Sequence, residues 1–141
     1  MKGTPLGRLE LFEHEGKSSR VNLVETLVIK PGVTADTYTF ENDAARDLAI
    51  VTVEPGSATP LQRVDAGDRT IEGHVCGAGT LTLYTTDARL RVYEFADWDL
   101  FETDVLVGES MQWRAGLTVP LVFYEICYPP YADGRFKDLE P

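Results

Sequence analysis

The residues best suited to acid–base chemistry lie close together on one predicted strand. The segment Arg69–Cys76 contains Glu72 and His74. Side chains two residues apart on a strand point to the same face, so Thr70, Glu72, His74 and Cys76 are expected to share one face. Histidine exchanges a proton readily near neutral pH, and a neighbouring carboxylate can orient its imidazole ring. Glu72 and His74 therefore form a candidate proton-transfer pair.

Metal ligands are scarce in the sequence. A catalytic transition metal needs about three protein ligands, whereas the chain has two histidines, His14 and His74, and two cysteines, Cys76 and Cys127. A site built from Glu72, His74 and Cys76 would be spread along one strand at about 7 Å per step, so the three side chains would not converge. We therefore expect no metal and no other cofactor, and we interpret both cysteines as buried, reduced thiols.

Each candidate also has a purely structural interpretation. The structural interpretation of His74 is a core histidine held by one hydrogen bond, with Glu72 as its partner, because an unpaired buried carboxylate is costly. Trp113 and the tyrosines Tyr84, Tyr93 and Tyr124 offer aromatic surface for a sugar ring, although core or interface packing is the commoner use of such residues. These alternatives stay open at the level of the sequence.

The elements that carry these residues are predicted to be strands throughout. Short β-rich runs are separated by Pro-Gly, Gly-Asp and Asp-Gly pairs, which are typical of turns between strands. Only Glu41–Asp47 or Asp97–Asp104 has the composition of a helical turn. About ten closely spaced strands indicate a sandwich or barrel. We expect strands over Arg8–Glu13, Val21–Lys30, Thr37–Phe40, Leu48–Glu54, Leu61–Val64, Arg69–Cys76, Gly79–Tyr84, Arg89–Phe95, Asp104–Val107, Ser110–Trp113 and Leu121–Tyr128.

Size and charge limit the classes of function. The chain has 141 residues, of which 43% are hydrophobic and 26% charged, so a single globular domain is expected. Its net charge of −10 disfavours nucleic acid and anionic membranes as partners. Apolar runs such as Val119–Tyr124 are too short for a membrane span, and the early charges do not fit a signal peptide. We therefore expect a cytoplasmic protein.

Two regions resemble the conserved motifs of the cupin superfamily. The first motif has a glycine, five residues, His-x-His, then a glutamate six residues before a second glycine. Here Gly56 is followed by five residues and Gln62-Arg63-Val64, and six residues separate Thr70 from Gly77. The spacing matches the motif, but Gln62, Val64 and Thr70 occupy the positions of its metal ligands.

The second motif should carry Pro-x-Gly, a histidine and an asparagine. The corresponding region is similar to 107–116 running into Leu121–Pro130, where Trp113 lies near the expected proline and no histidine occurs. The ending Tyr-Glu-Ile-Cys-Tyr-Pro-Pro is similar to the last core strand and exit turn of small cupins. The resemblance covers about residues 48–131.

The resemblance implies an all-β fold, a single-domain antiparallel jelly-roll β-barrel with a pocket in its mouth. The two ends of the chain are polar, so we expect an N-terminal arm at 1–20 and a C-terminal tail at 132–141 that lie outside a barrel at 21–131. The position of Thr70 faces the metal in ordinary cupins, so the face shared with Glu72 and His74 should point inward. Such barrels commonly pair, so we expect a homodimer.

The function implied by the resemblance is that of a metal-free pocket protein for a small polar, carbohydrate-like ligand. Metal-free cupins include sugar epimerases and isomerases that move a proton beside a carbonyl, which suggests His74 as base, Tyr84 as acid and Glu72 as the group that orients the imidazole. Gln62, Thr70, Tyr93, Trp113 and Tyr124 are the expected substrate contacts. One alternative is a non-catalytic cupin that senses a ligand or mediates assembly, and a second is a metalloenzyme with atypical ligands.

Overall fold

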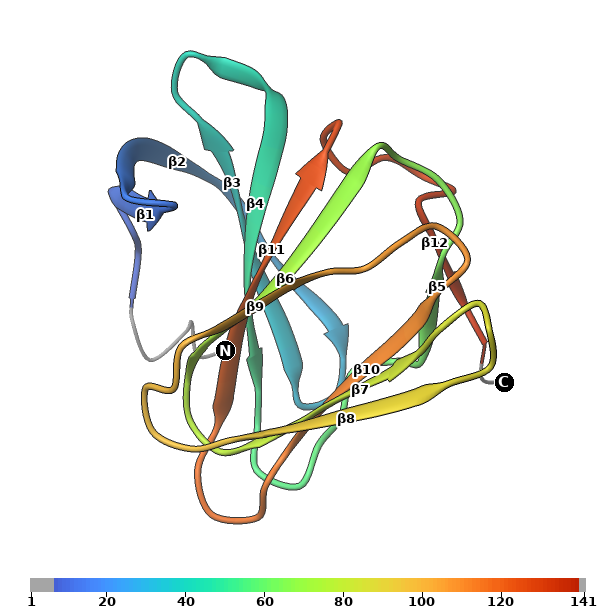
Figure 1. Cartoon of the computed structure of the whole chain (residues 1–141). Helices are drawn as coiled ribbons and strands as arrows, with labels where there is room; N and C mark the ends of the chain where they lie inside the picture. Colours follow the sequence, from blue (N-terminus) through green and yellow to red (C-terminus); the bar gives the residue numbers. More distant parts are fainter. Residues whose placement is uncertain (1–6, 140–141) are drawn as a thin grey trace.

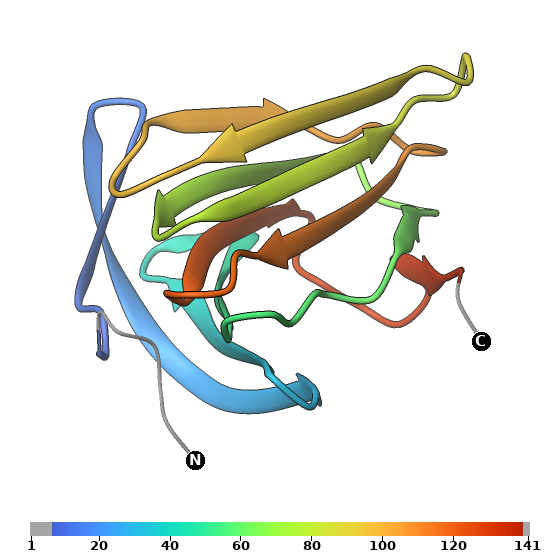
Figure 2. The ribbon, with the colours of Figure 1, turned by 90° about the horizontal axis from the view of Figure 1, so that it is seen from below.

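The computed structural model describes residues 7–139, which form twelve strands and no helix. Two antiparallel sheets curve towards each other as a half-barrel (Figures 1 and 2). The strands are β1 Leu11–His14, β2 Lys17–Lys30, β3 Val33–Phe40, β4 Asp43–Val53, β5 Gln62–Val64, β6 Arg69–Cys76, β7 Gly79–Tyr84, β8 Leu90–Phe95, β9 Phe101–Asp104, β10 Ser110–Ala115, β11 Leu121–Tyr128 and β12 Phe136–Asp138.

The seven-stranded sheet has the order β1-β2-β3-β4-β11-β6-β9, and the five-stranded sheet has the order β12-β5-β10-β7-β8. The predicted all-β jelly-roll class is confirmed by this arrangement. Strands far apart in sequence are neighbours, since β11 lies between β4 and β6. The described residues contain no helix of the length and apolarity that a membrane crossing requires.

The larger sheet is apolar on both faces because both faces are covered. Its inner face packs against the smaller sheet, with residues such as Val33, Leu121 and Phe123 in the shared core. Its outer face holds a second apolar cluster that includes Ile71 and Ile126. Alternation along β6 and β11 produces the two faces, since neighbouring residues on a strand point in opposite directions.

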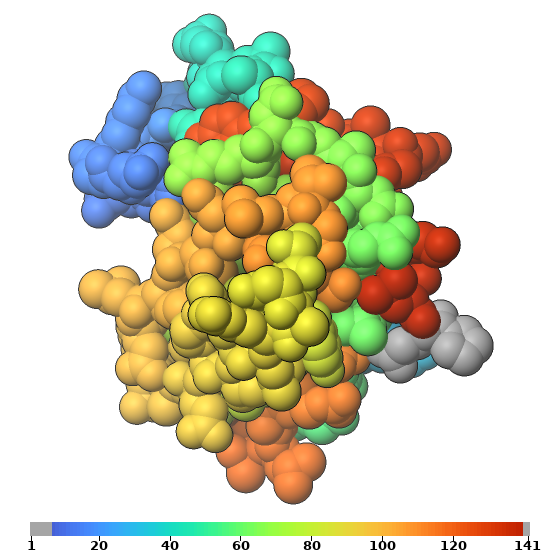
Figure 3. Space-filling model, turned by 45° about the vertical axis from the view of Figure 1, so that its right-hand side comes forward, coloured from blue at the N-terminus to red at the C-terminus, as the bar shows by residue number. Residues whose placement is uncertain are grey.

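The N-terminal arm takes part in the sheet. β1 pairs with the first residues of β2, and Phe12 packs on the outer face with its ring centre 5.2 Å from that of Tyr124. The segment 17–20 lies beside the turn at 40–43 (Figure 3). The expectation that residues 1–20 lie outside the barrel is therefore wrong for β1 and for the part of β2 before Val21, while residues 1–6 lie outside the described residues.

Three further expectations are corrected. Glu41–Asp47 forms a hairpin turn and a strand rather than a helical turn, because Asn42 adopts a left-handed φ of 64° and chain reversal follows at once. The strand expected at Asp104–Val107 occurs three residues earlier, as β9. The C-terminal tail is not outside the fold, because β12 pairs with β5 and so covers the edge of the smaller sheet.

Candidate functional site

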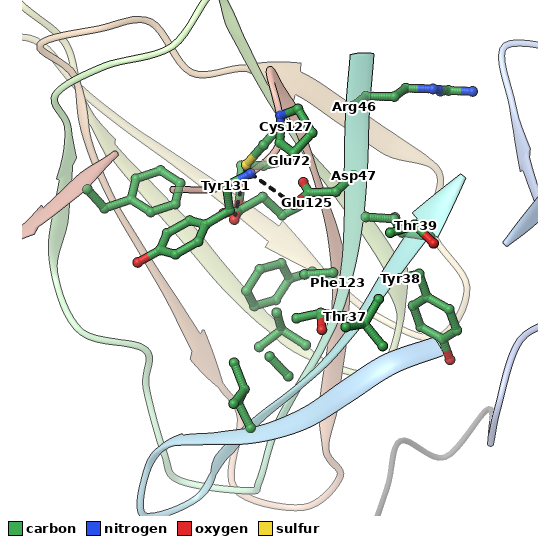
Figure 4. Close-up of a pocket in the computed structure, with 18 of the residues that line it drawn as sticks. Thr37, Tyr38, Thr39, Arg46, Asp47, Glu72, Phe123, Glu125, Cys127 and Tyr131 are labelled. Atoms are coloured by element: carbon green, nitrogen blue, oxygen red, sulfur yellow. Dashed lines mark hydrogen bonds between the residues drawn. The ribbon is translucent and has the colours of Figure 1, made fainter. Parts of the chain in front are cut away.

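A cavity of about 870 Å³ opens between the two sheets. The mouth of a β-barrel is a common place for a small-molecule site. The cavity is lined from one side by β2, β3, β4, β11 and β6, and from the other by β5 and β10, with β12 at its rim. Its lining includes Ala49, Val51, Gln62, Met111 and Trp113. Figure 4 shows Thr37, Asp47, Glu72, Phe123, Glu125, Cys127 and Tyr131, which also line it.

The polar part of this wall is acidic. On β11, alternation directs Phe123, Glu125 and Cys127 into the cavity. Glu125 lies directly across from Glu72 on β6, and Cys127 lies across from Asp47 on β4. Three carboxyl groups and one thiol from three neighbouring strands therefore meet on one patch of the wall (Figure 4).

Glu72 is the most deeply buried member of this acidic patch. Its side chain is fully buried, with 0% of the residue exposed. The indole Nε1 of Trp113 donates a hydrogen bond of 2.8 Å to Glu72 Oε1. The other oxygen, Oε2, accepts no hydrogen bond from an N–H or hydroxyl group of the described residues, and its side-chain partner is the carboxyl group of Glu125. Two buried carboxyl groups approach each other at low cost only when one of them is protonated, so Oε2 is the oxygen through which Glu72 shares a proton with Glu125.

Glu72 and Glu125 interact strongly as acids. Burial raises the pKa of Glu72 well above its usual value, and the adjacent negative charge of Glu125 raises it further. Burial also raises the pKa of Glu125. Two neighbouring carboxyl groups in a desolvated site cannot both ionise at low cost. The pair therefore keeps one proton at pH values where exposed glutamates have lost theirs, and full burial favours Glu72 as the protonated partner.

Asp47 and Cys127 extend the acidic patch. Asp47 Oδ2 accepts a 2.9 Å hydrogen bond from the main-chain N–H of Tyr131, and burial raises the pKa of Asp47. The Cys127 thiol donates to Glu125 Oε1 over 3.7 Å. Burial also raises the pKa of Cys127, which keeps the thiol protonated and makes it a weak nucleophile.

The two arginines near the cavity are engaged elsewhere. Arg46 lies at the rim, where its Nε donates to Asp43 Oδ2 over 2.9 Å and its guanidinium lies 3.7 Å from the ring centre of Phe40. Arg135 is buried and donates to three main-chain carbonyls and to Thr70 Oγ1. Neither guanidinium forms an ion pair with the acidic patch.

The structure brings three of the expected site residues into the cavity lining: Glu72, Gln62 and Trp113. Gln62 Nε2 donates to Asp138 Oδ1 over 2.8 Å. Thr70 lies on the inner face but is covered by the guanidinium of Arg135, so it does not line the cavity.

His74 lies outside the cavity lining, and the expected contact between His74 and Glu72 is absent. The imidazole is buried, with Nδ1 2.7 Å from the carbonyl oxygen of Asp99 and Nε2 2.9 Å from that of Gly77. Its ring is stacked on Phe95 with a centroid separation of 4.7 Å. His74 shares the inner face of β6 with Glu72. It lies one step further along the strand, where this face packs in the closed aromatic core.

Cys76 does not share that inner face as expected. The register between β6 and β11 shifts between Val122 and Phe123, and this β-bulge turns Cys76 towards the outer cluster. Both cysteines are free thiols; Cys127 is buried and Cys76 is half-buried.

The three tyrosines also lie away from the cavity. Tyr84 is 46% exposed at the end of β7. The ring of Tyr93 packs on Phe101 with centroids 4.7 Å apart. Tyr124 lies on the outer face, where its ring occupies the space that a side chain at Gly73 would need.

Glu125, Asp47, Phe123 and Cys127 are site residues that the sequence reasoning missed. The signal was present, because Glu125 is the one charged residue in the otherwise apolar and aromatic run Leu121–Tyr128. Alternation alone places Glu125 on the same face as Phe123 and Cys127. Its pairing with Glu72 could not be read from the sequence, since that pairing depends on how the sheet is ordered.

The residues in the metal-ligand positions of the cupin motif do not fit a metal. Gln62 lines the cavity, Val64 is buried in the apolar core, and Thr70 accepts a hydrogen bond from Arg135. Across residues 7–139, no group of three or more His, Cys, Asp or Glu side chains is arranged to hold a metal ion.

Comparison with known proteins gives matches at the level of structure. No protein-family model and no curated protein sequence matches the chain. The S161A mutant of Bacillus subtilis oxalate decarboxylase OxdC matches with a TM-score of 0.67 and 20% identity, over 82% of this chain and 30% of that chain. Lactobacillus farciminis oxalate decarboxylase matches with a TM-score of 0.60 and 16% identity, over 74% of this chain and 31% of that chain.

A third match is to a different kind of protein. The capsular polysaccharide assembling protein CapF from Staphylococcus aureus matches with a TM-score of 0.66 and 13% identity, over 85% of this chain and 35% of that chain. The chain thus spans about a third of the length of these proteins, and the likeness at such low identity is one of fold. Since oxalate decarboxylase and CapF are both cupin-fold proteins, the chain has the fold of the cupin superfamily.

Proposed function

We propose that the cavity binds a small polar, carbohydrate-like metabolite, and that Glu125, which shares a proton with Glu72, moves a proton to and from this ligand. The observation that carries the proposal is the pair of interacting glutamates on the wall of a large cavity. Desolvated pairs of carboxyl groups that share a proton are a recurring source of acid–base catalysis.

The lining of the cavity suits a ring that bears hydroxyl groups. The rings of Trp113 and Phe123 are stacked with centroids 4.3 Å apart, and Trp113 is also stacked on Phe95, so these buried rings form the closed apolar end of the cavity. Tyr131, which is 56% exposed, also lines the cavity, and an aromatic face packs well against the apolar face of a sugar. Gln62 and Thr37, which also line the cavity, can donate and accept hydrogen bonds to hydroxyl groups.

The two glutamates have different roles in the proposed reaction. Glu125 is only half-buried, so it meets the ligand, whereas Glu72 is fully buried behind it. The Glu125 carboxylate takes a proton from a carbon beside a carbonyl group, and the electron pair of the C–H bond moves towards the carbonyl oxygen. Return of the proton to the same carbon restores the carbonyl compound with its hydrogen exchanged. Return to the neighbouring carbon gives the aldose–ketose isomer when the proton of the adjacent hydroxyl group passes to the former carbonyl oxygen, and no other reactant is consumed.

Glu72 acts in this proposal as a positioning residue. Its proton supports the charge on Glu125, and the hydrogen bond from Trp113 fixes the carboxyl group that supplies this proton. His74 and Tyr84 have no role in the proposed step, because neither side chain lines the cavity.

Carbohydrates are the first ligands to test. The fold match to CapF, a capsular polysaccharide assembling protein, supports this choice. The matches to oxalate decarboxylases do not support their metal chemistry here, because Gln62, Val64 and Thr70 stand at the ligand positions.

The experiment is hydrogen exchange in D2O with a panel of aldoses, ketoses and sugar nucleotides, followed by proton NMR. We expect the wild-type protein to exchange a C–H beside the carbonyl of at least one compound. Glu125→Gln should slow this exchange by about 100-fold or more while binding persists. Glu94→Gln, at an exposed position on β8, is the matched control and should behave as wild type.

Two results would overturn the proposal. If no compound binds, the cavity is not a carbohydrate site. If a compound binds to the wild-type protein without exchange, or if Glu125→Gln exchanges at the wild-type rate, proton transfer by Glu125 is excluded and the non-catalytic sensing role is supported instead.

A further inference from the structure

We propose that the cavity selects a hydroxylated amine, such as an amino sugar, and that the ligand's ammonium group binds against Asp47 and Glu125. This inference rests on the proposed function, because it specifies the class of polar metabolite that the same cavity takes. It is carried by the distribution of charge on the cavity wall, where Asp47 and Glu125 form no ion pair with any described residue.

The cavity wall has a marked excess of negative groups. Five carboxyl groups line it, belonging to Glu25, Asp43, Asp47, Glu72 and Glu125, and Arg46 is the one arginine or lysine in the lining. The guanidinium of Arg46 is committed to Asp43 and to the ring of Phe40. A phosphorylated or carboxylated ligand would bring like charge into a partly desolvated space, which is strongly unfavourable.

The inner acidic patch has no cation in contact with it. Among the ion pairs formed by residues 7–139, none involves Asp47, Glu72 or Glu125. Arg135 acts on Asp47 and Glu125 through its charge, since its guanidinium donates hydrogen bonds to main-chain carbonyls and to Thr70. Carboxylates held in a cavity without a paired cation favour a cationic ligand.

The arrangement of the carboxyl groups points to the same place. Glu72 lines the cavity and is fully buried, and its Oε2 has no partner but the carboxyl group of Glu125, so Glu72 keeps the shared proton and the negative charge of the patch remains on Glu125 and Asp47. An ammonium group has three N–H donors and no acceptor. It therefore matches a patch made of carboxyl oxygens on neighbouring strands, where Asp47 lies diagonally from Glu125 across the β4–β11 pair.

Hydroxyl and aromatic contacts complete the match. Tyr131, which is 56% exposed, lines the same cavity, and an aromatic face attracts both an ammonium group and the apolar face of a sugar ring. Gln62 remains as a donor and acceptor for hydroxyl groups.

Protons should be released when the ammonium binds. The groups that face the binding position are Asp47, Glu72, Glu125, Cys127 and the main chain of Tyr131, with Arg135 at longer range. Burial raises the pKa of Asp47 and of Glu125, and a bound cation favours their ionised forms, while Glu72 keeps the shared proton. The complex therefore holds fewer protons than the free protein and ligand, and the affinity should rise with pH until the amine itself loses its proton.

The test is isothermal titration calorimetry with D-glucosamine, D-galactosamine and D-mannosamine, each compared with its parent sugar, its N-acetyl derivative and its parent sugar 6-phosphate. We expect at least one amine to bind about 10-fold or more tightly than its parent sugar, with the phosphate weakest. Measurement in two buffers of different ionisation enthalpy should show proton release for the amine only. Asp47→Asn should make the affinities for the amine and for its parent sugar more nearly equal. Glu94→Gln should leave the ratio of the two affinities unchanged.

The outcomes separate this inference from the proposed function. If a parent sugar binds as tightly as its amine, and exchange in D2O still requires Glu125, the inference is wrong and the proposed function stands. If none of the compounds binds, both fall. Stoichiometric binding of Mn2+ or Ca2+ that Asp47→Asn abolishes would assign the acidic patch to a metal and would also overturn the inference.

Discussion

Replacing Glu72 by glutamine tests the shared proton of the carboxyl pair through the stability of the fold. The amide oxygen of Glu72→Gln can still accept from Trp113 Nε1, and the amide nitrogen can donate to Glu125, as a protonated carboxyl group would. The variant therefore reproduces the protonated form of Glu72 at every pH. The wild-type protein must instead keep a proton or place a second negative charge beside Glu125.

The sign of the pH dependence follows from the raised pKa. Because the pKa of Glu72 in the folded state lies above its value in the unfolded chain, the folded state binds more protons in the window between the two values. Wild-type stability therefore contains a contribution that falls as pH rises through this window. The variant lacks that contribution. Its free energy of unfolding should therefore increase relative to that of the wild type as pH rises.

The magnitude is bounded by linkage. One titrating group changes the free energy of unfolding by at most about 1.4 kcal/mol per pH unit. Between pH 5 and pH 7 the free energy of unfolding of the variant should rise relative to that of the wild type by up to about 2.7 kcal/mol. This rise ends once the pH exceeds the pKa of Glu72 in the folded state. Urea unfolding followed by far-UV circular dichroism at pH 5, 6 and 7 measures this difference.

Glu94→Gln, at an exposed position on β8, is the control for the loss of one carboxylate at the surface. Its stability difference from wild type should not change appreciably with pH over this range. A difference for Glu72→Gln that stayed constant, or shrank as pH rose, would refute the claim that a proton is shared inside the cavity wall.

Four further substitutions test other parts of the structure. Trp113→Phe removes the donor to the buried carboxyl group and should cost about 1–3 kcal/mol in urea unfolding. Arg135→Lys leaves main-chain carbonyls without their donor and should cost roughly 2–3 kcal/mol. Gly73→Ala places a Cβ 2.0 Å from the Tyr124 ring and should cost about 1–3 kcal/mol by overpacking. We propose that the apolar outer part of β2, where Val28 is 61% exposed, is the interface of the expected homodimer. Val28→Lys should then be a monomer in light scattering. A monomeric wild-type protein would contradict this proposal.

The fold was predictable because alternation and turn residues are local signals. The expected strands Arg69–Cys76, Gly79–Tyr84 and Leu121–Tyr128 match the structure at both ends. β12 was missed because its three residues are too few to show alternation. β9 was misplaced because the register of a short strand is set by its partner, here β6.

The site was predictable only in part. Alternation correctly placed Glu72 and His74 on one inner face, but it carries no information on how far along a strand the cavity extends. His74 therefore lies in the aromatic core, one step beyond the cavity wall. Glu125 reaches Glu72 through a contact between strands about 50 residues apart in sequence, and such pairings depend on the order of strands in the sheet.

The most direct test of the central claim is a 13C NMR titration of the side-chain carboxyl carbons in protein labelled at glutamate, with Glu72→Gln and Glu125→Gln used for assignment. We expect one signal from the Glu72–Glu125 pair to keep the chemical shift of a protonated acid to a higher pH than the ordinary pKa of a glutamate allows. If Glu72 and Glu125 both titrate as ordinary exposed glutamates and are fully ionised at pH 6, the shared proton does not exist and the proposed chemistry of the cavity is contradicted.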